Sequence, residues 1–122
     1  MKNITIYHNP KCSNSRGALA LLEGKGIKPA VVEYLKTPLS RTELKKLAAA
    51  LKATAGKDWL GLRDGMLRTR EPVYAELGLK DASDDELLAA VAEHPILLNR
   101  PIVSTPKGTV LARPPETAES VL

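Results

Sequence analysis

Short apolar runs and one amphipathic stretch alternate over the first 35 residues. The runs at 4–7 and 30–34 are rich in β-branched residues, which is typical of strands. Between them, the segment 13–25 has an apolar helical stripe and ends before Gly26, which predicts a helix. The stripe consists of Ala18, Leu19 and Leu22. A strand, a helix and a second strand in this order normally give two parallel strands with a right-handed crossover.

The middle of the chain has the pattern of several helices. Serine and glutamate stand three residues apart at Ser40 and Glu43 and again at Ser83 and Glu86, which is the spacing of a capping box at a helix start. The first of these helices should end near the glycine at position 56, and the second near residue 93. Two further helices are predicted between them, at about 58–67 and 73–77.

The last 20 residues predict a hairpin and a terminal helix. Strands are expected at 102–104 and at about 109–112, joined by a turn at Lys107 and Gly108, with a helix at about 115–122. Parallel pairing followed by an antiparallel hairpin gives a mixed four-stranded sheet. We therefore expect an α/β, thioredoxin-like fold that forms one domain over residues 1–122, with a helical insertion between the βαβ unit and the hairpin.

Composition and charge narrow the classes of partner. Hydrophobic residues make up 43% of the chain, as in a globular protein, and the formal charge of +4 favours anionic ligands. The basic residues are scattered among acidic ones and aromatics are only 3%, which argues against nucleic-acid binding. The longest apolar run, 87–92, is far shorter than the roughly 20 residues of a membrane span. A strand that begins at Ile4 leaves no room for a signal peptide, so we expect a cytoplasmic protein without a membrane partner.

The chain has a single cysteine, Cys12. One cysteine excludes a disulfide within the chain and a zinc site built from several thiolates, and it fits a reducing compartment. We expect no metal and no tightly bound cofactor. A lone cysteine is often a small buried apolar residue, so its neighbours must decide whether it is reactive.

Cys12 stands between the first predicted strand and the first predicted helix, in a segment rich in polar and basic residues. Ligands of open α/β sheets bind beyond the carboxyl ends of the strands. The unpaired N–H groups and the dipole of a helix start stabilise a thiolate and can hold a tetrahedral oxyanion. Asn14 and Ser15 are short enough to hydrogen-bond a thiolate or its ligand, and Lys11 and Arg16 add positive charge. This pattern favours a reactive Cys12 over a buried apolar one.

Two neighbours of Cys12 have alternative roles. His8 either bonds the loop backbone or sets the charge and orientation of the thiolate. Ser15 either begins the helix or donates to the thiolate. Ser15 also stands where a C-x-x-C motif has its second cysteine, so an outside thiol must release any adduct on Cys12. Glutathione, followed by a separate redox protein, is the simplest source of that thiol.

Several blocks of the sequence together resemble the glutaredoxin-coupled arsenate reductases of the bacterial arsenic-resistance family. The blocks lie at 4–16, 67–68, 74–79, 94–103, 105–106 and 113–114 and extend over essentially the whole chain. The resemblance implies that Cys12 attacks arsenate to form a covalent sulfur–arsenic adduct, that His8 favours the thiolate and that Ser15 is hydrogen-bonded to the sulfur. It also implies that glutathione and glutaredoxin supply the reducing thiols.

The resemblance further implies that three arginines converge on the oxyanion. Arg68, Arg100 and Arg113 occupy the matching positions. Arginine is always charged and binds oxyanions with two parallel hydrogen bonds, which suits this role; the alternative for each is a surface ion pair. Arg70 could replace Arg68. Thioredoxin-like folds hold a cis proline beside the thiol, and the bond between Arg100 and Pro101 is the candidate.

Two other functions remain open at this point. One is a redox-responsive transcription regulator that binds RNA polymerase, although such relatives often carry a C-x-x-C switch that this chain lacks. The other is a glutathione-dependent thiol transferase, which needs a glutathione groove more than a group of arginines. The sequence favours arsenate reduction over both.

Overall fold

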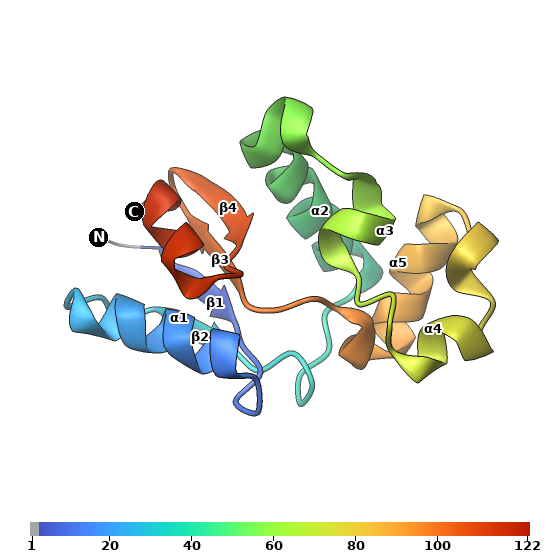
Figure 1. Ribbon diagram of the computed structural model, residues 1–122, viewed down its shortest axis with the longest axis horizontal. Coiled ribbons are helices and arrows are strands. Elements are labelled where there is room, and N and C mark those ends of the chain that lie inside the picture. Colours follow the sequence, from blue (N-terminus) through green and yellow to red (C-terminus); the bar gives the residue numbers. More distant parts are fainter. Residues whose placement is uncertain (1–2) are drawn as a thin grey trace. The chain divides into compact units, whose positions relative to one another are not determined.

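The computed structural model describes residues 3–122, which form two compact units (Figure 1). The sheet unit comprises the described residues up to Thr37 together with Arg100–Leu122, and the helical unit comprises Pro38–Asn99.

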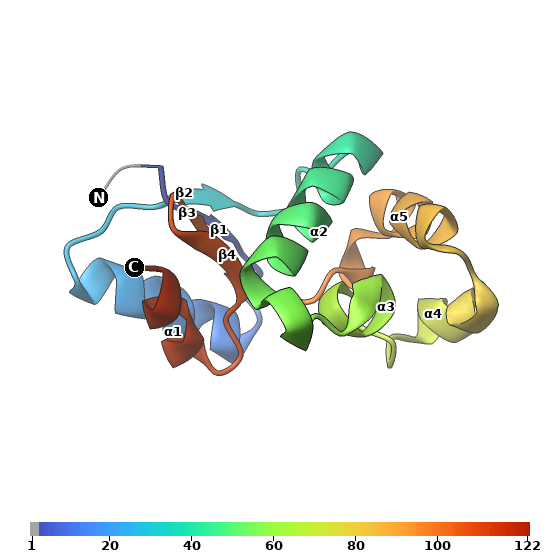
Figure 2. The same cartoon turned by 90° about the horizontal axis from the view of Figure 1, so that it is seen from above.

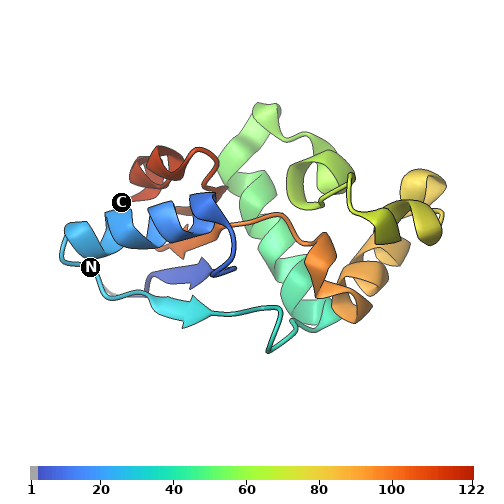
Figure 3. The same ribbon diagram turned by 60° about the horizontal axis from the view of Figure 1, so that its bottom comes forward.

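The sheet unit contains a mixed four-stranded sheet in the order β2-β1-β3-β4. The strands are β1 (Thr5–Tyr7), β2 (Ala30–Val32), β3 (Ile102–Thr105) and β4 (Gly108–Leu111). β1 pairs parallel to β2 and antiparallel to β3 (Figure 3). β3 and β4 form the antiparallel hairpin. The predicted fold class is therefore confirmed. β2 is shorter than predicted, because residues 34–36 turn out of the strand.

Helix α1 (Ser13–Gly24) and the 3-10 helix η4 (Pro115–Val121) lie on the same side of the sheet (Figure 2). The predicted terminal helix is thus present in the tighter 3-10 form. Gly17 allows a close approach between the two helices, since a Cβ at that position would lie 2.9 Å from Cγ of Pro115. The core of this unit consists of Ile4, Ile6, Ala18, Leu22, Val103, Ala112, Ala118 and Val121.

The helical unit is built from four α-helices and three 3-10 helices among its described residues. They are α2 (Arg41–Ala55), η1 (Gly56–Asp58), α3 (Gly61–Met66), α4 (Pro72–Glu76), η2 (Leu79–Asp81), α5 (Asp84–Glu93) and η3 (Pro95–Leu97). Both predicted capping boxes are present: the Ser40 and Ser83 hydroxyls accept from the N–H groups of Glu43 and Glu86. The helix predicted at 58–67 is shorter, because the backbone at Trp59 and Leu60 leaves helical geometry before Gly61.

Candidate active site

The loop between β1 and α1 places Cys12 at the start of the helix. The His8 N–H donates to the carbonyl of Val32 at 2.8 Å, which extends the pairing of β1 with β2 by one residue. The chain then turns, and the Cys12 N–H donates to the carbonyl of Asn9 at 3.0 Å. Cys12 has an extended conformation at the N-cap of α1, and its carbonyl accepts the N–H of Arg16. The nucleophile predicted from the sequence therefore lies beside the unpaired N–H groups of a helix start.

Several groups around the Cys12 sulfur favour the thiolate. Burial alone would raise the pKa of Cys12, but the backbone N–H groups of Ser15 and Asn14 and the charges of two arginines act in the opposite direction. The net effect lowers the pKa of Cys12 below its ordinary value of 9.0. Nη1 of Arg113 lies 3.7 Å from Sγ of Cys12, and the charge of Arg100 also lowers this pKa. The site thus combines a stabilised thiolate with cationic donors.

The Ser15 hydroxyl is fully buried and forms its hydrogen bonds with residues of the loop. Its Oγ accepts the N–H of Asn9 at 3.0 Å and lies 2.6 Å from Nδ1 of His8. The sulfur is reached by the backbone N–H of Ser15. The bond from the Ser15 side chain to the sulfur, which the resemblance implied, stays a prediction, because the hydroxyl has these two other partners and only the main chain of Ser15 acts on Cys12 here.

His8 is buried beside Ser15. Burial lowers the pKa of His8, Glu33 partly offsets this, and Arg16 lowers it further. A neutral imidazole with its proton on Nε2 accepts a hydrogen bond from the Ser15 hydroxyl at Nδ1. In this state His8 acts on the loop through a hydrogen bond, without a positive charge.

Arg100 and Arg113 come from the two ends of the hairpin. Arg100 immediately precedes Pro101 and β3, and Arg113 follows β4 by two residues. Nη1 of Arg113 also donates to the carbonyl of Arg100 at 2.9 Å. The bond between Arg100 and Pro101 is cis, which confirms the sequence prediction, and the bond between Arg113 and Pro114 is also cis, which the sequence did not indicate. The two predicted arginines therefore lie together beside Cys12.

Arg68 belongs to the helical unit. Its N–H donates to the carbonyl of Leu97 at 2.7 Å, beside the isolated bridge between Leu67 and Leu98. Nη1 of Arg68 forms an ion pair of 3.1 Å with Oε2 of Glu71, with both side chains about a quarter exposed. Arg70 is exposed. The assignment of Arg68 rather than Arg70 to the substrate stays a prediction.

Neither Asn9 nor Tyr34 was singled out from the sequence as a site residue. Both side chains are buried. Burial raises the pKa of Tyr34 to about 12, while Arg100, Asn9 and Arg113 lower it in part. The available signal in the sequence was a tyrosine at the carboxyl end of the strand predicted at 30–34, the end that faces the loop.

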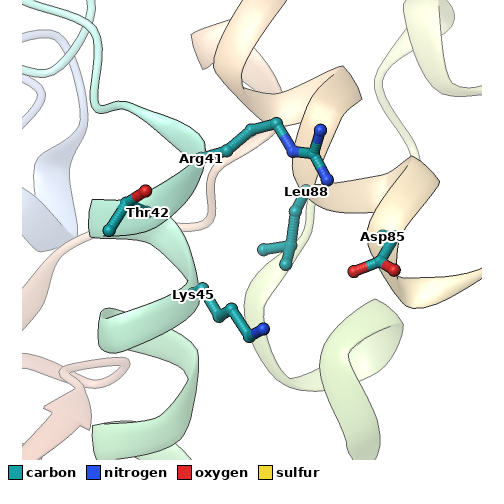
Figure 4. A pocket seen from close by; sticks show the side chains of 5 residues that line it. All are labelled: Arg41, Thr42, Lys45, Asp85 and Leu88. Carbon is teal, nitrogen blue, oxygen red and sulfur yellow. The ribbon is translucent and has the colours of Figure 1, made fainter.

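A separate groove of about 310 Å³ lies in the helical unit (Figure 4). Arg41, Thr42 and Lys45 of α2 face Asp85 and Leu88 of α5. Its charged side chains are exposed and it contains none of the predicted site residues. The groove is therefore not the candidate active site.

Among residues 3–122, no group of three or more histidine, cysteine, aspartate or glutamate side chains could hold a metal ion. None of the helices in the same range is long and apolar enough to cross a membrane.

Known proteins are similar to this chain over nearly its whole length. The profile of the ArsC family matches residues 7–121. An arsenate reductase of Rhizobium meliloti (strain 1021) is 48% identical over 98% of this chain and 81% of its own length. An arsenate reductase of Neisseria meningitidis is 44% identical over the full length of both chains. The solved structure of an arsenate reductase from Vibrio cholerae is 47% identical, covers 98% of each chain and has a TM-score of 0.89.

Proposed function

Because the chain belongs to the ArsC family, we propose that it is an arsenate reductase that converts arsenate to arsenite through a covalent adduct on Cys12. The observation that carries the proposal is the position of the Cys12 sulfur, at a helix N-terminus and 3.7 Å from a guanidinium nitrogen of Arg113. This arrangement places a nucleophile and oxyanion donors in one place.

In the first step the Cys12 thiolate attacks the arsenic atom of arsenate. A sulfur–arsenic bond forms and one arsenate oxygen leaves as water after protonation. Arg100 and Arg113 hold the remaining oxygens and neutralise the negative charge that would otherwise repel the thiolate. Asn14 and Ser15 contribute backbone N–H groups to the sulfur.

His8 and Ser15 keep the loop in the geometry that this attack requires. The Ser15 hydroxyl links Nδ1 of His8 to the N–H of Asn9, so both ends of the loop are connected by one buried group. A neutral His8 leaves Arg100 and Arg113 as the cations beside the sulfur. We therefore assign His8 and Ser15 to the orientation of the nucleophile.

Two thiols from outside the chain supply the electrons, because the chain has only one cysteine. Glutathione replaces an oxygen on arsenic and releases water. The thiol of glutaredoxin then attacks the glutathione sulfur, which gives a mixed disulfide and transfers two electrons to arsenic. Hydrolysis of the bond between Cys12 and arsenic(III) releases arsenite and restores the thiol. This chemistry needs a reducing compartment, which favours the cytoplasm.

The test is a coupled assay that follows NADPH oxidation with arsenate, glutathione, glutaredoxin and glutathione reductase. Wild-type protein should turn over only when all components are present, and Cys12→Ser should be inactive. Omission of glutaredoxin or of glutathione should each abolish turnover. If the complete system with folded wild-type protein gives no turnover, arsenate reduction is wrong.

A further inference from the structure

Asn9 is a buried polar residue whose side chain has no role in the proposed mechanism. It lies in the loop between β1 and α1 and is 6% exposed. Its side-chain Oδ1 accepts the N–H of Lys11 at 3.0 Å, which closes a turn of the kind that asparagine forms with the residue two positions on. A buried amide oxygen without a partner is costly, so this bond favours one rotamer of Asn9.

The main chain of Asn9 makes two further bonds within the same loop. Its carbonyl accepts the N–H of Cys12 at 3.0 Å, which closes a four-residue turn with Pro10 and Lys11 at its centre. Its N–H donates to Oγ of Ser15 at 3.0 Å, which connects the turn to the first turn of α1. Asn9 therefore holds the loop at three positions, and one of them is the nucleophile itself.

The N–H groups around the nucleophile fall into two sets. Those of Lys11 and Cys12 are bonded to Asn9. Those of Asn14 and Ser15 act on the Cys12 sulfur and favour the thiolate. An N-cap side chain reaches such N–H groups when its backbone is extended, as it is at Cys12, with φ −95° and ψ 125°. The turn at Asn9 supports this backbone conformation, because it fixes the two N–H groups that immediately precede it.

We propose that Asn9 is a positioning residue for the nucleophile, whose side-chain oxygen closes the turn at Lys11 and so holds the Cys12 sulfur beside the start of α1. Without that oxygen the N–H of Lys11 can bond to water, since Lys11 is exposed, and the turn gains freedom. The sulfur then spends less time beside the N–H groups of Asn14 and Ser15. The proposal rests on the proposed function only in that Cys12 is the reacting group.

The test uses Asn9→Ala, which removes the side-chain acceptor and keeps the main-chain groups of Asn9. The rate of Cys12 alkylation by iodoacetamide, measured against pH, gives the midpoint at which the thiolate forms, without any need for arsenate. Asn9→Ala should raise this midpoint by about half a pH unit, which is part of the contribution of one buried hydrogen bond. Asn9→Ser, whose hydroxyl can accept the N–H of Lys11 in a similar turn, should recover at least about half of the shift.

The matched control is Ser40→Ala in the helical unit. It deletes an acceptor of the same kind, a side-chain oxygen that accepts the backbone N–H of Glu43 at 3.1 Å, and should leave the midpoint unchanged. Urea unfolding of each variant measures any loss of stability. A wild-type midpoint in folded Asn9→Ala would overturn the proposal, as would equal shifts in Asn9→Ala and Asn9→Ser or in Asn9→Ala and Ser40→Ala.

Amide hydrogen exchange, followed by NMR, tests the bond in wild-type protein and does not depend on the folding of any variant. The N–H of Lys11 should exchange at least about tenfold more slowly than in the unfolded chain. Exchange at the unfolded rate would overturn the proposal. A failed arsenate assay together with a raised midpoint in Asn9→Ala would contradict the proposed function and leave this proposal standing. An active enzyme with an unchanged midpoint in Asn9→Ala would contradict this proposal alone.

Discussion

The two units use their polar side chains in different ways. In the helical unit, Ser40 and Ser83 are exposed and bond to residues three positions away in sequence. In the sheet unit, His8, Asn9 and Ser15 are buried and bond to one another across a loop. Within residues 3–122, the buried side chains of polar or charged residue types other than tyrosine all lie in the sheet unit. They are His8, Asn9, Ser15, Thr105 and Thr109.

This difference indicates that the polar side chains of the helical unit stabilise single helices, whereas those of the sheet unit serve the chemistry of the site. Exposed capping residues accept hydrogen bonds from the unpaired N–H groups at a helix start at little cost in free energy, because water solvates the polar groups that the side chain leaves unpaired. Buried polar groups are costly unless each has a partner, and such networks specify one geometry. The sheet unit uses that geometry to orient Cys12. Changes in the two units should therefore affect different measurements.

The largest effect should come from an arginine beside the sulfur. Arg100→Ala removes a charge that favours the thiolate and a donor for the oxyanion. We expect kcat/KM for arsenate to fall at least tenfold, or about 1.4 kcal/mol. The control is Arg41→Ala in the groove of the helical unit, which should change kcat/KM by less than about twofold. Equal losses in both variants would remove the functional distinction between the units.

Arg68 is the candidate exception to this distinction, because it lies in the helical unit. Arg68→Ala should lower kcat/KM by about fivefold, less than Arg100→Ala, because the ion pair with Glu71 offsets part of its charge. Arg70→Ala is the matched control and should have little effect. A larger loss in Arg70→Ala would assign the substrate contact to Arg70.

Removal of a helix cap should affect stability alone. Ser83→Ala deletes the acceptor for the N–H of Glu86 at the start of α5 and should lower the free energy of unfolding by about 1 kcal/mol. Urea denaturation measures this loss, and Ser40→Ala should behave in the same way. Both variants should keep the wild-type kcat/KM where they are folded. A parallel fall in kcat/KM would show that the caps contribute to the site.

The smallest effect should be a change in the pH dependence of stability. Burial lowers the pKa of His8 below 6.5, so below this pH the unfolded chain takes up a proton more readily than the folded chain. The stability of wild-type protein should therefore contain a component that is lost as pH falls from about 6.5 towards the folded pKa. His8→Gln should remove this component, as measured by urea unfolding at pH values on both sides of 6.5. His94→Gln is the control for the loss of one histidine, and an unchanged slope in His8→Gln would contradict this account.

Local patterns were sufficient to predict most elements of both units. The capping boxes at Ser40 and Ser83 give the starts of α2 and α5, and the order of strands and helices gives the mixed sheet. The position of Cys12 between a strand and a helix also followed from the sequence. Each of these features depends on residues a few positions apart or on the order of elements. Both can be read from the periodicity and spacing of residues in the sequence.

Tertiary structure decided how the side chains of the site are connected. Arg113 reaches Cys12 across 101 positions of sequence, and the Ser15 hydroxyl is hydrogen-bonded to both His8 and Asn9. The periodicity of the sequence does not predict such contacts, because they depend on the register of the strands and on the rotamers that packing allows. The sequence by itself determined that Cys12 has the surroundings of a nucleophile. Only the fold determined which groups hold its sulfur, because buried polar groups need hydrogen-bond partners and tertiary packing decides which partners lie within reach.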